Sequence, residues 1–256
     1  MSESLQEGLQ HFVAKWYARE PEMQFAEVFV PASDKLLFHV WGALLHELKH
    51  TLFELSDQHV TEIKTAWWAD EFQRLSNGQP RHPITQALPD VSVPWTSLAA
   101  GLFSVIEASA IRAGNTEQAI SNLLPFASAL VEIEDSLFDA KAASPKEIFA
   151  VHCLLHRLPN GLSAEDQAGI PMHLMARHSV SAAQLPNIGR NGLLRDWAAE
   201  LSSALPDKTA GTLFRSARTR FDRARLKRLL AGKGFAAPSA PMNLWHAWRA
   251  AVTVSR

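Results

Sequence analysis

Apolar residues recur along most of this chain at steps of three and four, the spacing of an amphipathic α-helix. The clearest stripe runs through Leu36, Val40, Leu44, Leu48, Leu52 and Leu55, and predicts a helix from about Leu36 to Leu55. A second set occupies the middle of the chain, at Ile106, Ile111, Ile120, Leu123, Leu124 and Leu130. Strand signals are weak, since Val28-Phe29-Val30 is the only strand-like run and no Asn-Gly or Asp-Gly hairpin lies between alternating segments. The pattern therefore predicts an all-α protein.

Helix breakers divide the chain at short intervals. They fall near Pro31, Gly78–Pro83, Pro89–Pro94, Gly114, Ser144, Pro159–Pro171, Pro206 and Gly232–Pro241. None of these segments is long or biased enough for a domain linker, and no repeat occurs at a fixed period. At one of them, Ser144, Pro145 and Glu147 have the pattern of an N-cap, a first-turn proline and a first-turn acid. We expect a single domain, residues 1–256, built from about ten helices.

Composition narrows the class of protein. The 256 residues are 47% hydrophobic and 20% charged, an ordinary globular balance, and the net charge of -1 gives no case for nucleic-acid binding. The single cysteine, Cys153, cannot form an internal disulfide, which fits a reducing compartment. No secretory signal precedes the first helix pattern, and no apolar run is long enough to span a bilayer. We expect a cytoplasmic protein, with peripheral contact at the inner membrane as a second interpretation.

The most specific segment lies between Lys64 and Leu88. Trp67 and Trp68 sit on a helical pattern that stops at Ser76-Asn77-Gly78, and a Pro80-Arg81-His82-Pro83 corner leads into the next helix. Because proline fixes φ and disfavours helix in the residue before it, the corner is tightly specified.

This segment resembles the squalene/phytoene synthase family, whose members carry a Trp-containing helix, a glycine and a Pro-x-His-Pro corner. Three other places are similar to the family in the same order along the chain. They are Val30-Pro31 followed by Lys35, the Ala168–Met175 segment with its continuation from His178 to Leu185, and the basic run Arg223–Leu229. The resemblance implies the isoprenoid-synthase fold, an all-α helical bundle with a central cavity.

The family's reaction, head-to-head prenyl condensation, needs Mg²⁺ held by carboxylates on two facing helices while diphosphate leaves. Counted from Pro31, the first acidic motif falls on Lys49, His50 and Phe53. Counted from Pro171, the second falls on Leu158, Gly161 and Leu162, and the family's Gly-Arg pair falls on Asp166-Gln167. None of the six motif positions is acidic, and only Arg157 keeps the family's residue. The resemblance therefore implies a degenerate site without Mg²⁺-dependent catalysis.

A rival pattern overlaps the first motif. His46-Glu47-Leu48-Lys49-His50 has the H-E-x-x-H form of zinc proteases, in which the two histidines share one helix face. The charged Lys49 is unusual there, and Phe53 and Ser56 occupy the positions of the extended form's glycine and third ligand. We interpret the segment as the polar edge of a mostly buried helix. A weaker alternative is that His46, Glu47 and His50 line the former diphosphate pocket.

Two charge patterns have both a structural and a functional interpretation. Glu132, Asp135 and Asp139 form an acidic stripe, which exposed helices carry routinely. Residues 215–228 hold seven Arg or Lys against the one acid Asp222, with apolar residues interleaved. This run fits either the solvated face of a late core helix or a basic amphipathic helix lying on anionic lipid.

Cysteine and tryptophan give weaker signals. Adjacent residues on a helix point about 100° apart, so His152 and Cys153 are not a nucleophile–base pair, and Cys153 is expected in the core. Trp245 and Trp248, three apart, are expected to form a packing clamp.

Two functions follow. The first is a non-catalytic relative of the synthases that binds a prenyl or other lipid, or acts as an assembly partner of another protein, as some members of the family do. The ligand-pocket candidates are His46, Glu47, Lys49, His50, Phe53 and Arg157, with no catalytic residue, metal or cofactor. The second is an active Mg²⁺-dependent prenyl transferase acting on isoprenoid diphosphates, which would need displaced acids such as Glu47, Glu54, Asp135 or Asp139.

Overall fold

The computed structural model describes residues 3–158, 169–182, 184, 191–205, 211–234 and 236–254. Within these residues the chain forms thirteen α-helices and no strand, which confirms the all-α prediction. The helices are α1 (Glu3–Arg19), α2 (Met23–Glu27), α3 (Lys35–Phe53), α4 (Gln58–Ser76), α5 (Pro83–Gln86), α6 (Trp95–Ser109), α7 (Thr116–Ser121), α8 (Leu124–Leu137), α9 (Lys146–Arg157), α10 (Met172–Arg177), α11 (Asn191–Ala204), α12 (Leu213–Leu230) and α13 (Ala240–Val254).

Helix α3 lies at the middle of the bundle. Most of its circumference is buried, as expected of a helix surrounded by others rather than lying on a surface. It packs against α1, α4, α5, α6 and α9. Its contact with α1 is close because the indole of Trp16 lies directly against Gly42, where any side chain would collide with the ring.

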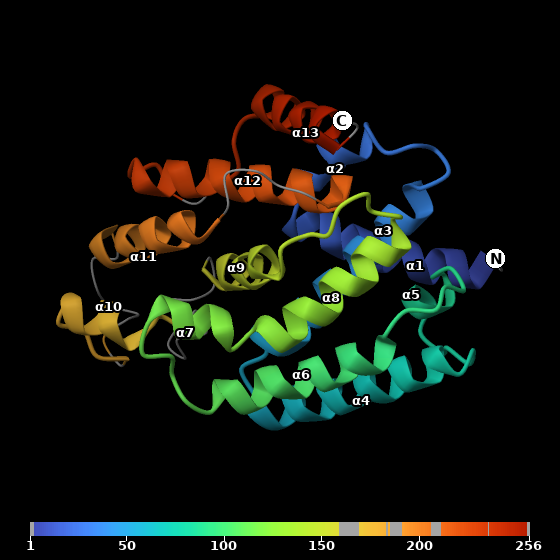
Figure 1. Ribbon diagram of the computed structural model, residues 1–256, viewed down its shortest axis with the longest axis horizontal. Helices are drawn as coiled ribbons and strands as arrows, with labels where there is room; N and C mark the ends of the chain where they lie inside the picture. Colours follow the sequence, from blue (N-terminus) through green and yellow to red (C-terminus); the bar gives the residue numbers. More distant parts are fainter. Residues whose placement is uncertain are drawn as a thin grey trace.

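The other helices lie on two sides of this centre (Figure 1). The α4–α6 pair forms one side, and α12 with α13 forms the opposite side, with α8 and α9 between them. The order of packing runs from α4 to α6, from α6 to α8 and from α8 to α9. Helix α12 then contacts α2, α9, α11 and α13, so one face of α12 is turned toward the centre of the molecule.

The predicted Pro-x-His-Pro corner is present between α4 and α5. Gly78 has a φ of +71°, a conformation that glycine adopts without strain, and it ends α4. The buried Glu71 carboxylate accepts hydrogen bonds from the backbone N–H groups of Arg81 (2.8 Å) and His82 (2.9 Å), and from the Thr85 hydroxyl. His82 Nδ1 accepts the N–H of Ile84 at 3.2 Å, so this side chain caps α5.

The predicted N-cap of α9 is wrong. The helix begins at Lys146, with Pro145 at the cap position, and Ser144 plays a different part. Its backbone N–H and its hydroxyl donate to Asp135 at 2.9 and 3.0 Å, so Ser144 joins the end of α8 to the start of α9. Asp135 of the acidic stripe is therefore a structural acceptor in the turn.

Among the described residues, no helix is long and apolar enough to cross a membrane.

Candidate functional site

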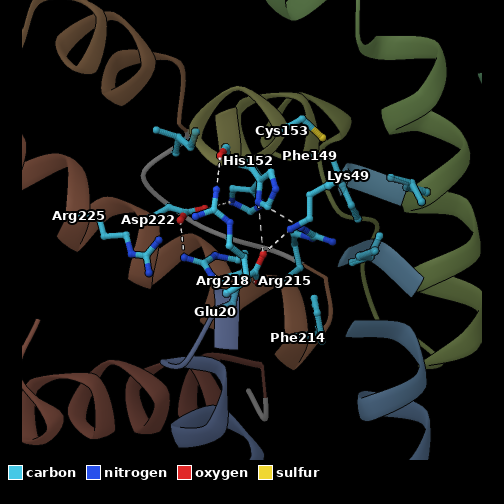
Figure 2. Close-up of a pocket in the computed structure, with 15 residues that line it drawn as sticks. Glu20, Lys49, Phe149, His152, Cys153, Phe214, Arg215, Arg218, Asp222 and Arg225 are labelled. Atoms are coloured by element: carbon cyan, nitrogen blue, oxygen red, sulfur yellow. Dashed lines mark hydrogen bonds and ion pairs between the residues drawn. The ribbon is translucent and has the colours of Figure 1, made fainter. Parts of the chain in front are cut away.

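A network of buried charged side chains fills the centre of the bundle. Glu20 follows α1, Lys49 comes from α3, and His152 from α9, while Arg215, Arg218, Asp222 and Arg225 lie along one face of α12. Figure 2 shows these side chains pointing toward one another. Arg215 is 2% exposed, Arg218 5% and Asp222 4%, so these charges lie in the interior. Buried charges are tolerated when they are paired and hydrogen-bonded.

The Arg215 half of the network centres on Glu134 of α8, which is fully buried. Arg215 forms an ion pair with this carboxylate through Nη2 and donates a second hydrogen bond from Nε at 3.3 Å. Trp41 Nε1 and the Thr212 hydroxyl each donate to Glu134 at 2.7 Å. The Arg215 guanidinium also stacks 3.2 Å above the ring of Phe149. Glu134 thus has four donor contacts, one from α3 and three from α12 and its N-cap residue, which fixes α12 against α8 and α3.

The Arg218 half ties α12 to the turn between α1 and α2. Arg218 contacts Glu22 at 2.7 Å and Glu20 at 3.2 Å through Nη1, and donates to Asp222 through Nη2. Arg225, about two turns further along than Arg218, pairs with Glu22 at 2.8 Å. Burial raises the pKa of Asp222, whereas the carboxylates around Arg218 hold the pKa of that guanidinium well above its usual range. Arg218 therefore remains charged.

The third part lies at the end of α3. Lys49 forms an ion pair with Glu20. Glu54 accepts hydrogen bonds from its neighbours, with His156 at 2.6 Å, His50 at 3.0 Å and Arg19 at 3.2 Å. Burial opposes the charged form of Glu20 and of Glu54. The cations and hydrogen bonds around them prevail and lower both pKa values, so both acids are ionised.

Three histidines around the network, His46, His152 and His156, are neutral. Burial, together with Arg215 and Arg218, holds the pKa of His152 well below its usual value. His152 Nδ1 can then accept from Arg215 Nη1 at 2.8 Å. Burial and the Lys49 charge lower the pKa of His156 and of His46 from 6.5 to about 4. These three side chains therefore carry no charge at neutral pH, and the charges around Glu20 and Glu134 come from Lys, Arg and acidic side chains.

The charged side chains at the centre of the bundle balance one another, and the cavity between them is small. Five cations, Arg19, Lys49, Arg215, Arg218 and Arg225, face five carboxylates, Glu20, Glu22, Glu54, Glu134 and Asp222. The cavity between these side chains has a volume of about 40 Å³, which is room for a water molecule or two. Among the described residues, no three or more His, Cys, Asp or Glu side chains are grouped as a metal site. The arrangement suits a structural ion-pair core.

The six predicted pocket residues do not converge on one site. Lys49 and His50 belong to the network through Glu20 and Glu54. His46 is 8% exposed, and its ring centroid lies 6.3 Å from that of His50. Glu47 is half-buried on the same helix. Phe53 and Arg157 form a separate pair.

The positions predicted for the second acidic motif are only partly described. Leu158 is buried at the end of α9. Gly161, Leu162, Asp166 and Gln167 lie outside the described residues, as do Ala168 and Leu185 of the resemblance.

Phe53 and Arg157 lie at a second, larger cavity. The Arg157 guanidinium stacks 5.1 Å from the Phe53 ring, and both residues line a cavity of about 440 Å³ between the ends of α3, α6 and α9. Arg112 lies in the same wall and donates to the Ile170 carbonyl at 2.9 Å. Gly169, with a φ of +58°, leaves room for Arg157, since a Cβ there would lie 2.8 Å from the guanidinium. Apolar side chains line the cavity together with polar groups, and the apolar residues include Leu52, Leu55, Val105, Ile106, Leu123 and Leu154.

Three further sequence predictions have mixed outcomes. Cys153 is buried as expected, and burial raises the pKa of its thiol to about 11. The prediction that Trp245 and Trp248 form a packing clamp is wrong, because these side chains are 48% and 47% exposed. For the basic run 215–228, the predicted solvated face is wrong at Arg215 and Arg218, because both side chains are buried. Contact of this run with a membrane stays a prediction.

The inward charged face of α12 is the main feature that the sequence predictions missed. Its signal is present in the spacing, because Arg215, Arg218, Asp222 and Arg225 recur at steps of three and four. An acid in phase with three arginines is a mark of internal pairing on one face.

Fold and site together define an all-α helical protein with a charge-balanced ion-pair core. In comparisons with known proteins, no family model and no curated protein matches the chain. The likeness to squalene/phytoene synthases thus depends on the sequence motifs described above.

Proposed function

We propose that this chain is a non-catalytic protein resembling the squalene/phytoene synthases, which binds an anionic prenyl or related lipid without converting it. The ordered motifs along the sequence support an isoprenoid-synthase-like bundle. The all-helical architecture is compatible with that fold.

One observation carries the non-catalytic part of the proposal. At the position where the family would present its first Mg²⁺ ligand, Lys49 forms an internal ion pair with Glu20. Mg²⁺ requires oxygen ligands, so the donors here do not fit this ion. Two of the four displaced acids already have partners, because Glu54 is hydrogen-bonded to His156 and Arg19, and Asp135 to Ser144. These contacts argue against the alternative of an active transferase.

The larger cavity supports the binding part of the proposal. Its volume of about 440 Å³ falls in the usual range for small-molecule sites, roughly 300–1,000 Å³. Arg112 and Arg157 lie in one wall among apolar side chains. A ligand with an anionic head and a hydrocarbon tail would place its head at these two arginines and its tail along the apolar residues of the wall. The core cavity of about 40 Å³ is too small for such a tail.

Arg157→Gln should weaken this binding about tenfold or more, since a hydrogen bond to a charged group contributes roughly 1.5–3 kcal/mol. The measurement is equilibrium dialysis with radiolabelled farnesyl diphosphate, followed by recovery of the ligand. Wild type is expected to bind the diphosphate more tightly than farnesol and to return it intact. Arg74→Gln, which removes an arginine paired with Asp70 on the surface of α4, is the matched control. Equal affinity in the Arg157→Gln variant would reject this cavity as the site.

A further inference from the structure

The outer face of α13 is unusually apolar for a surface helix. Met242, Leu244, Trp245 and Trp248 are each between 43% and 48% exposed. The helix packs inward through the small or buried residues Asn243, Ala247 and Ala250, which turns both tryptophans outward. Helix α13 lies at the edge of the molecule, outside α12 and α2 (Figure 1). We call the face formed by Met242, Leu244, Trp245 and Trp248 the α13 apolar face.

Positive charge lies beside this face, on the side toward α12. Arg249 on the same helix lies 5.8 Å from the Trp245 ring. Arg220 of α12 donates to Thr253 of α13 at 3.0 Å, and Lys227 is exposed on α12. Burial, followed by the charges of Arg249 and Arg223, lowers the pKa of Arg220, which marks a cluster of like charges. Burial lowers the pKa of His246, and the nearby charges of Arg220 and Lys227 lower it further.

Acidic side chains are nearly absent from this part of the chain. Residues 211–256 contain ten Lys or Arg and one acid, although the whole chain contains 25 and 26. The one acid, Asp222, is buried against Arg218. On α2, which packs against α13, Glu27 is paired with Tyr17 and His39. Three of the ten cations, Arg215, Arg218 and Arg225, are paired with acids of the core, and the other seven give this end of the chain an excess of positive charge.

We propose that the α13 apolar face docks on an anionic lipid surface, with Trp245 and Trp248 at the headgroup level and the adjacent cations against lipid phosphates. Indole rings favour the membrane–water interface, and basic residues beside an apolar helix face add attraction to anionic lipid. Lipid phosphate complements the positive charge beside this face. This surface is separate from the 440 Å³ cavity, so its docking does not depend on the ligand proposed for that cavity.

The test is co-sedimentation of the full chain with two kinds of vesicle. One is phosphatidylcholine alone, and the other contains about one-third phosphatidylglycerol to supply negative surface charge. Wild type should pellet with the anionic vesicles at least about tenfold more strongly, and this preference should shrink as salt is raised. Equal pelleting with both vesicles, or none with either, overturns the proposal.

Variants locate the contact. Trp245→Ser with Trp248→Ser, and separately Arg249→Glu, should each lower anionic-vesicle binding by about fivefold or more. Trp67→Ser is the matched control, because Trp67 is 46% exposed on α4 and should bind like wild type. Circular dichroism checks that each variant is folded, and Arg249→Glu keeps the test informative if the tryptophan variant is not. Unchanged binding in the folded variants overturns the proposal. So does a lipid-free dimer in sedimentation velocity that the tryptophan variant abolishes, because it would assign the face to self-association.

Discussion

Glu134→Gln is expected to lower the free energy of unfolding by about 3–5 kcal/mol, because it leaves Arg215 buried without its counter-charge. Arg215 is 2% exposed and Glu134 fully buried, so bulk solvent does not reach either group. The same carboxylate also accepts from Trp41 and Thr212, and a neutral amide is a weaker acceptor for all three donors. Urea unfolding monitored by circular dichroism measures the difference.

Two companion variants separate charge loss from general damage to α8. Glu132→Gln lies two residues away on the exposed face and should change stability by less than about 0.5 kcal/mol. The double variant Glu134→Met with Arg215→Met should recover part of the loss, because apolar residues of similar volume remove the unpaired charge. A loss below about 1 kcal/mol for Glu134→Gln would contradict a structural ion pair at this place.

Acid should destabilise the protein before Glu20 and Glu54 become protonated, because the contribution of three buried histidines to stability is lost at a higher pH than that of these acids. The pKa values of His46 and His156 fall from 6.5 to about 4 in the folded chain, and that of His152 falls well below 6.5. A histidine with a lowered folded pKa gains its proton first in the unfolded chain. Stability is therefore full above pH 6.5 and is lost as pH falls from 6.5 toward 4. Each shift of this size corresponds to roughly 3 kcal/mol.

The buried acids change the stability of the protein differently from the histidines. Two of them act at lower pH, and two act in the opposite direction. Glu20 and Glu54 have lowered pKa values, so their contribution begins to fall only as pH drops below about 4.5, the usual glutamate value. Asp222 and Asp135 have pKa values raised by burial and offset part of the loss. Urea titrations at a series of pH values should show unfolding free energy decreasing between pH 6.5 and 4. A flat or rising curve in that window would contradict neutral buried histidines.

Local patterns in the sequence predict the helical architecture well. The apolar stripe places the central helix at Leu36–Leu55, and the structure has α3 at Lys35–Phe53. The Pro80–Pro83 corner is equally local, since proline geometry and a positive-φ glycine define it without distant contacts. The buried acceptor that completes this corner, Glu71, is not visible from the pattern, because a glutamate on α4 looks like any exposed acid.

The features that the sequence did not predict depend on which face of a helix turns inward. Sequence rules place charged side chains on the surface. This rule fails on α12, because Glu20, Glu22 and Glu134, which are distant in sequence, pair with its arginines in the interior. On α13 the opposite rule fails, because the small residues Ala247 and Ala250 make the close contact and Trp245 and Trp248 remain outside. The spacing within each helix shows which residues share a face, but contacts with other helices decide whether that face is buried.

The central claim is that the middle of this bundle is a structural ion-pair core and not a Mg²⁺-dependent catalytic chamber. Release of diphosphate from farnesyl or geranylgeranyl diphosphate, measured with purified full chain and Mg²⁺, tests it most directly. The account predicts release no faster than in buffer containing Mg²⁺ alone. Mg²⁺-dependent release that Glu20→Gln abolishes, while Glu132→Gln leaves it intact, would contradict it.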